Sequence, residues 1–256
     1  MEKHNQLEKD VRMTDSIPNC LVRVKYSFVA NMDKIPNNRE EAWLTGVLFD
    51  CPRIRRKRVV GIRTAHNQLD NPKLVDIVGI TNFKGSTRKK QFQPIPLELN
   101  SVGVVSSGTS PIISIFWVDI QDGERPGLCD KDGEFIPAQT VTLPNNGIWT
   151  STEDIALSEG SYAVLGVHQT TTALELVNIK ARVRTSRTYH EGAVLEFEQR
   201  VVGQVNLEGS PIFDGMGHLV ALGLFVGRLK SGEEGLVGMS IKHLAATYGH
   251  MIEGTI

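Results

Sequence analysis

The apolar residues of this chain recur mostly at every second position, in short runs separated by turn-forming residues. Leu21 to Tyr26 alternates apolar and polar side chains, which is the period of a half-buried strand. Further runs of strand character lie at 42–49, 59–66, 74–80, 92–99 and 110–118 in the first half, and at 162–167, 174–183, 193–197 and 235–240 in the second. The pattern predicts an all-β protein.

Two segments depart from this period. Residues 241–248 carry apolar side chains at helical spacing, with Ser240 as a candidate N-cap and Gly249 as a candidate end, so a short C-terminal helix is expected. Residues 121–146 are rich in glycine, proline and aspartate and carry few apolar runs, which is typical of a connector.

The stretch from Asn206 to Phe213 combines a tight turn with a strand. Gly209-Ser210-Pro211 marks the turn, because glycine tolerates a positive φ and proline cannot continue a ladder. A hairpin at residues 214–218 and an apolar run at 219–226 follow, and the run reads as a strand buried on both faces.

Charge and cysteine content narrow the class of protein. The 28 Lys and Arg residues nearly balance 29 Asp and Glu residues, so no net field recruits nucleic acid or an acidic membrane. Three cysteines without CxxC spacing read as free thiols in a reducing compartment. The start of the chain lacks a signal-peptide pattern, and no apolar run is long enough for a membrane span. We expect an intracellular protein, cytoplasmic or nuclear, without a metal site or cofactor.

Residues 53–58 are strongly basic and have two interpretations. They include Arg53, Arg55, Arg56, Lys57 and Arg58, between two predicted strands. The segment is either a solvated hairpin tip or a contact for an anion or nucleic acid. The absence of aromatic residues in it speaks against stacking on single-stranded bases.

Two separated motifs resemble the trypsin-like (chymotrypsin/HtrA-type) serine proteases. Gly209-Ser210-Pro211 matches the end of the nucleophile segment of that family, and Thr64-Ala65-His66 matches the end of the strand that carries the general base. The resemblance implies two antiparallel six-stranded β-barrels and a short C-terminal helix. It divides the chain into a polar N-terminal segment at 1–19, a first barrel at 20–120, the connector at 121–146, and a second barrel with the helix at 147–256.

The resemblance also implies that the catalytic residues are degenerate. Glu208 stands at the nucleophile position, and Ser110 stands near the strand start where the family has the triad aspartate, beside the retained His66. Asn206 and Leu207 replace residues of the oxyanion loop, where glycine permits a strained peptide orientation. Ser210 falls two positions past the nucleophile. Acyl transfer needs an activated hydroxyl or thiol, an oriented base and an oxyanion site, so ordinary hydrolysis is not expected.

The favoured hypothesis is therefore a pseudoprotease that binds a protein or an extended peptide. Its partner can be another protein or a second copy of the chain. The expected cleft residues are His66, Asn206, Leu207, Glu208, Gly209 and Ser210, next to the strand at residues 221–226. Glu208 either forms an ion pair with His66 or points into water. The alternatives are an active peptidase with a non-standard catalytic set, and nucleic-acid binding through the basic loop 53–58.

Overall fold

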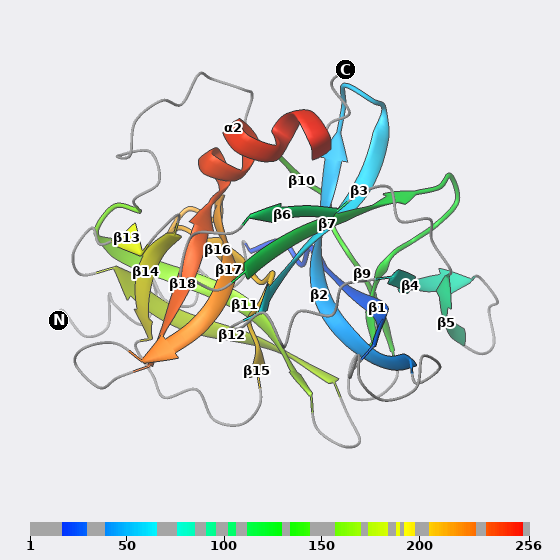
Figure 1. The fold of residues 1–256 in the computed structure, drawn as a ribbon, viewed down its shortest axis with the longest axis horizontal. Coiled ribbons are helices and arrows are strands. Elements are labelled where there is room, and N and C mark those ends of the chain that lie inside the picture. Colours follow the sequence, from blue (N-terminus) through cyan, green and yellow to red (C-terminus); the bar gives the residue numbers. More distant parts are fainter. Residues whose placement is uncertain are drawn as a thin grey trace, which may run out of the picture.

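In the residues that the structure describes, the fold consists of two large curved β-sheets and one helix (Figure 1). The computed structural model describes residues 17–29, 39–65, 76–84, 91–95, 102–105, 112–129, 134–143, 157–169, 174–183, 188–189, 192–197, 205–228 and 234–252. Strands make up most of these residues, so the all-β prediction is confirmed. Within these ranges, no helix has the length and apolar character needed to cross a membrane.

The first sheet is built from the N-terminal half of the chain. Its strands follow the order β5-β4-β1-β2-β3-β7-β6, and β10 pairs with β2 beside this path. The bounds are β1 Leu21–Val29, β2 Arg39–Cys51, β3 Arg56–Ala65, β4 Asp76–Lys84, β5 Gln91–Ile95, β6 Val102–Val105, β7 Ile112–Ile120 and β10 Val141–Thr142. The strand pairings of the described residues end at β5 and β6, so they form a curled sheet rather than a closed ring.

The second sheet is built from the C-terminal half and closes on itself. Its strands follow the order β12-β11-β16-β17-β18-β14-β13, and a further pairing of β12 with β14 completes a six-stranded ring. The bounds are β11 Gly160–Gln169, β12 Leu174–Val183, β13 Thr188–Tyr189, β14 Gly192–Phe197, β15 Val205–Asn206, β16 Pro211–Phe213, β17 Leu219–Arg228 and β18 Glu234–Ser240. The six-stranded barrel expected from the resemblance is present in this half.

The helix α2, Ile241–Ile252, follows β18 without a loop and packs against β17 and β18. Its N-cap is Ser240 as predicted, because the Ser240 Oγ accepts a hydrogen bond from the backbone N–H of Lys242 at 3.2 Å. The predicted end at Gly249 is wrong. Gly249 is a buried residue within the helix, which continues for three more residues, so packing outweighs the low helix propensity of glycine.

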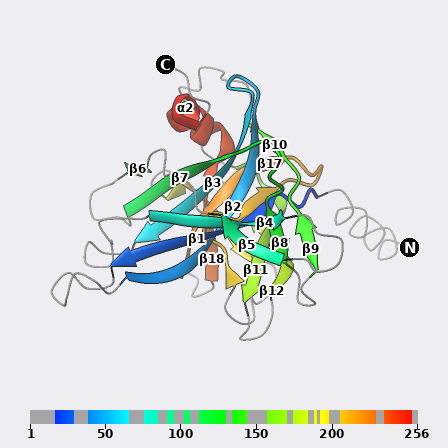
Figure 2. The same ribbon diagram turned by 90° about the vertical axis from the view of Figure 1, so that its right-hand side faces the viewer.

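The connector contains three short strands that the sequence pattern does not reveal. β8, Gly127–Cys129, pairs with β9, Phe135–Pro137, as a small separate sheet (Figure 2). β10 pairs in parallel with the end of β2, where Val141 lies opposite Phe49. Strands of two or three residues are too short to show a period, so their existence depends on the neighbour they pair with.

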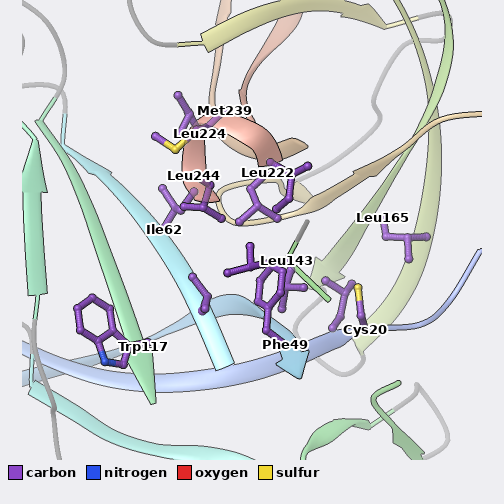
Figure 3. Close-up of a cluster of buried hydrophobic side chains, with 14 of the residues drawn as sticks. Cys20, Phe49, Ile62, Trp117, Leu143, Leu165, Leu222, Leu224, Met239 and Leu244 are labelled. Atoms are coloured by element: carbon purple, nitrogen blue, oxygen red, sulfur yellow. The ribbon is translucent and has the colours of Figure 1, made fainter. Parts of the chain in front are cut away.

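One hydrophobic core joins the two sheets. Phe49 and Ile62 come from the first sheet, Leu222 and Leu224 come from the second, and Leu244 comes from α2. Figure 3 shows these side chains together between the strands and the helix. All five are at most 1% exposed, so the two halves are held by continuous apolar packing.

Candidate functional site

The stretch that matches the protease nucleophile segment forms a tight turn. The backbone N–H of Ser210 donates to the Leu207 carbonyl at 3.2 Å, which closes a four-residue turn with Glu208 and Gly209 at its centre. Gly209 has a φ of +74°, a conformation that costs residues with a side chain about 1–2 kcal/mol. Glycine at this position is therefore required by the turn itself.

The turn lies against the first sheet. A Cβ atom built on Gly209 would fall 2.5 Å from the carbonyl oxygen of Thr45 in β2 and 3.3 Å from the backbone nitrogen of Ile62 in β3. Glu208, the residue before Gly209, is thus held at the junction of the two sheets. The absence of a side chain at Gly209 is what permits this close approach of backbone to backbone.

The turn is also fixed to β17 of the second sheet. The Gly209 N–H donates to the Gly223 carbonyl, and the Gly223 N–H donates to the Ser210 carbonyl, each at 2.8 Å. A side chain on Gly223 would collide with the carbonyl oxygen of Leu207. The role of Gly223 was not anticipated from the sequence, since a single glycine within an apolar strand only suggests some close backbone approach.

The strand ends that carry the other two triad positions are neighbours. Ala65, the last residue of β3, lies opposite Ile112, the first residue of β7. His66 follows Ala65 in the sequence and Ser110 precedes Ile112 by two residues, and both lie outside the described residues. Ile62, which the turn contacts, is three residues or about 10 Å of extended chain before Ala65. The two anchors recognised in the sequence are therefore close together in the fold.

The side chains of the turn have very different exposure. Leu207 is 3% exposed and Ser210 is 0% exposed, whereas Glu208 between them is only partly buried. The Ser210 hydroxyl, the only one in the turn, cannot meet a substrate without local unfolding. The half-buried corner thus carries a carboxylate, which is a poor acyl acceptor compared with an activated serine or cysteine. Asn206 belongs to β15 and lies opposite Val167 of β11.

Beyond this turn, the described strands pair with β17 on one side only. β16 accompanies β17 only between Leu219 and Leu222, whereas β18 accompanies it as far as Arg228. From Phe225 to Arg228, the described strands therefore pair with only one side of β17. Such an edge can accept an added strand through main-chain hydrogen bonds. The sequence anticipated a cleft strand at 221–226, and this part of β17 continues beyond it.

The basic loop forms the tip of the β2–β3 hairpin. Arg53, Arg55, Arg56 and Lys57 are exposed, whereas Arg58 is buried and its Nε lies 2.5 Å from the Asp119 Oδ1. Arg56 approaches the other oxygen of the same carboxylate at 3.2 Å. Asp119 thus offsets part of the charge of this loop, and a nucleic-acid contact here stays a prediction.

Other catalytic or metal-binding groups do not gather in the part of the chain that the structure describes. Cys20 and Cys51 are buried and Cys129 is half-buried, and none of the three is in a disulfide bond. Burial raises the pKa of the Cys20 thiol to about 12, so this residue is not a thiolate at neutral pH. Among the described residues, no group of three His, Cys, Asp or Glu side chains is arranged to hold a metal ion.

Comparison with known proteins gives a structural but not a sequence relationship. No family model and no curated protein matches this sequence. The scabies mite inactivated protease paralogue S-D1 is similar in structure, with a TM-score of 0.52 and 13% identity over 93% of this chain and 94% of that chain. A second scabies mite inactivated protease paralogue, S-I1, has a TM-score of 0.49 and 12% sequence identity, and the match covers 96% of both chains. An HtrA-type protease solved with a decapeptide has a TM-score of 0.46 and 11% sequence identity, and the match covers 96% of this chain and 68% of that chain.

The likeness to the first of these structures concerns the fold alone, since the sequence identity is so low, and the other two add nothing to it. It agrees with the two curled sheets joined by one core. This chain has the trypsin-like serine protease fold.

Proposed function

We propose that this chain is a catalytically inactive member of the trypsin-like fold that binds a protein or an extended peptide. The observation that carries the proposal is the composition of the turn at the sheet junction. Its corner residue is the half-buried Glu208, and its only hydroxyl, that of Ser210, is fully buried. A covalent acyl intermediate on this turn has no suitable nucleophile.

The binding role is supported by the side of β17 on which none of the described strands pairs with Phe225 to Arg228. An extended segment lying along Phe225 to Arg228 would gain main-chain hydrogen bonds without any catalytic group. It would pass the turn that carries Glu208, because the Gly209 N–H donates to the carbonyl of Gly223, which shortly precedes this part of β17. A cationic side chain on the bound segment would be favoured there by the carboxylate.

The loss of catalysis is tested by labelling the purified protein with a fluorophosphonate and mapping adducts by mass spectrometry. We expect no adduct on the unmodified protein. The Glu208→Ser variant is measured beside it, and an adduct that forms only in the variant would support the assignment of the nucleophile position. An adduct on any serine or threonine of the unmodified protein would contradict the proposal.

The binding role is tested by selecting peptides from a random display library and measuring their affinity by calorimetry. Glu208→Arg should change the affinity of a selected peptide by at least about tenfold, the scale of a contact to a charged group. Asp122→Arg is the matched control, since it makes the same charge change at an exposed turn away from the cleft. Methylation of alternate peptide nitrogens should weaken binding, because an added strand uses alternate main-chain groups.

Two results would contradict the binding role. The first is that no peptide is selected. The second is that Glu208→Arg and Asp122→Arg affect the affinity of the selected peptides equally.

A further inference from the structure

A second candidate site lies where the start of α2 meets the β16–β17 hairpin. A cavity of about 640 Å³ opens there, and its walls come from the segment before β1, from β10, from the start of β11, from the hairpin and from the first turn of α2. None of the residues Asn206 to Ser210 lines it. Its volume falls within the roughly 300–1,000 Å³ typical of pockets that enclose a small ligand.

The walls of this cavity are mainly apolar. Leu157, Phe213 and Ile241 are at most 7% exposed, and the half-buried Leu219 adds to the same wall. Tyr162 contributes its ring while its hydroxyl is already bonded to the Ser158 carbonyl at 2.6 Å. A bound molecule would therefore gain affinity by burying an apolar body against these side chains.

The charged residues that line the cavity are one acid and one base, and the base can attract a negatively charged group. Asp214 is the acidic residue among the lining side chains, and it is already held by the backbone N–H groups of Met216 and His218 at 2.8 and 2.9 Å and by the His218 ring at 3.3 Å. Lys242 contributes a positive charge from the first turn of α2, which carries no acidic residue.

The position of Lys242 strengthens this attraction. Its side chain stands at the N-terminal end of a helix of 12 residues, where the backbone dipole is also positive. An anion at this end of the helix would be attracted both by the lysine charge and by the backbone dipole. The lysine, the helix end and the apolar walls thus converge on one kind of ligand.

We propose that this cavity binds an amphipathic carboxylate, a molecule with an aliphatic or aromatic body and one acid group. The body lies against Leu157, Phe213 and Leu219, and the carboxylate lies beside Lys242 at the start of α2. The site is separate from the peptide-binding role, because the two share no residue. A ligand here would stabilise the contact of α2 with the β16–β17 hairpin by binding only the folded chain.

The proposal is tested by calorimetric titration of the full chain with dodecanoate below its micelle-forming concentration. We expect one site, and we expect dodecyltrimethylammonium, which has the same tail and the opposite charge, to bind at least about tenfold more weakly. Lys242→Glu should weaken dodecanoate binding by about tenfold or more. Lys57→Glu is the matched control, because it makes the same charge change at the exposed tip of the β2–β3 hairpin.

A second variant, Leu219→Glu, places a like charge on the apolar wall and should abolish dodecanoate binding. Its melting temperature and its peptide affinity are measured in parallel, so that loss of the fold is recognised. The amide resonances of Val220 and Lys242, both at the cavity, should shift on titration of the wild-type protein.

The proposal is wrong if the wild-type protein binds no dodecanoate, or if the cationic and anionic amphiphiles bind equally. It is also wrong if Lys242→Glu and Lys57→Glu have the same effect, or if a peptide carboxylate binds this cavity and dodecanoate does not. None of these results bears on the fluorophosphonate or peptide experiments, so the two proposals can fail separately.

Discussion

The contact of Gly209 with the first sheet can be tested by the substitution Gly209→Ala. The new methyl group would lie 2.5 Å from the Thr45 carbonyl oxygen, whereas an ordinary contact begins at 3.4 Å. The obstructing atom belongs to the backbone of a paired strand, so it cannot rotate away as a side chain would. The substitution therefore forces either the turn or β2 to move.

The expected cost has two parts. Alanine at a φ of +74° costs about 1–2 kcal/mol, partly offset by about 0.4–1 kcal/mol from the stiffer unfolded chain. Crowding against the Thr45 carbonyl adds about 1–3 kcal/mol. We expect the free energy of unfolding to fall by about 2–4 kcal/mol, and the urea midpoint to fall by roughly 1 M for a slope of about 3 kcal/mol per M.

Substitutions at two other glycines measure the backbone strain and the crowding separately. Gly123 has a φ of +87° and nothing within 4 Å of an added Cβ, so Gly123→Ala introduces strain alone. Gly223 has no positive φ but a Cβ there would meet the Leu207 carbonyl, so Gly223→Ala introduces crowding alone. The assay is urea unfolding followed by tryptophan fluorescence. If Gly209→Ala lowers the midpoint no more than Gly123→Ala does, the turn does not pack on the first sheet and the placement of Glu208 at the junction is wrong.

Three further predictions concern ionisable groups. Asp119→Ala should lower the free energy of unfolding by about 1.5–3 kcal/mol, because it removes the partner of Arg58, whose side chain is only 10% exposed. Arg56→Ala should lower it by less than about 1 kcal/mol, because the Arg56 side chain is 61% exposed. Equal effects of the two substitutions in urea unfolding would contradict this. Burial raises the pKa of the Cys20 thiol from 9.0 to about 12. The unfolded chain therefore loses this proton first, and stability should fall between these pH values by about 1.4 kcal/mol per unit. Comparing urea midpoints of the wild type and Cys20→Ala near about pH 8 and about pH 10.5 isolates the effect, and identical pH dependence in both would refute it. Iodoacetamide should alkylate the half-buried Cys129 of the native protein before Cys20, as read by peptide mapping.

Strand positions could be predicted because alternation is a local property of the sequence. β12, for example, was predicted with its observed bounds, and the Ser240 cap follows from a hydroxyl placed directly before a helical pattern. The turn was also recognisable in the sequence, since Gly209 to Pro211 match the family motif beside Glu208, and the loss of the catalytic residues stays a prediction. The roles of His66 and Ser110 stay predictions.

Only the tertiary structure decided what lies next to the turn. Thr45 and Ile62 are far from Gly209 in the sequence, and their contact depends on how two sheets pack, which no local period reports. The short strand β10, the part of β17 that the described strands pair with on one side only, and the cavity at Lys242 have the same origin. Each is formed by segments that are distant in the chain. The sequence therefore determined the strands and the turn, and packing determined which surfaces lie beside them.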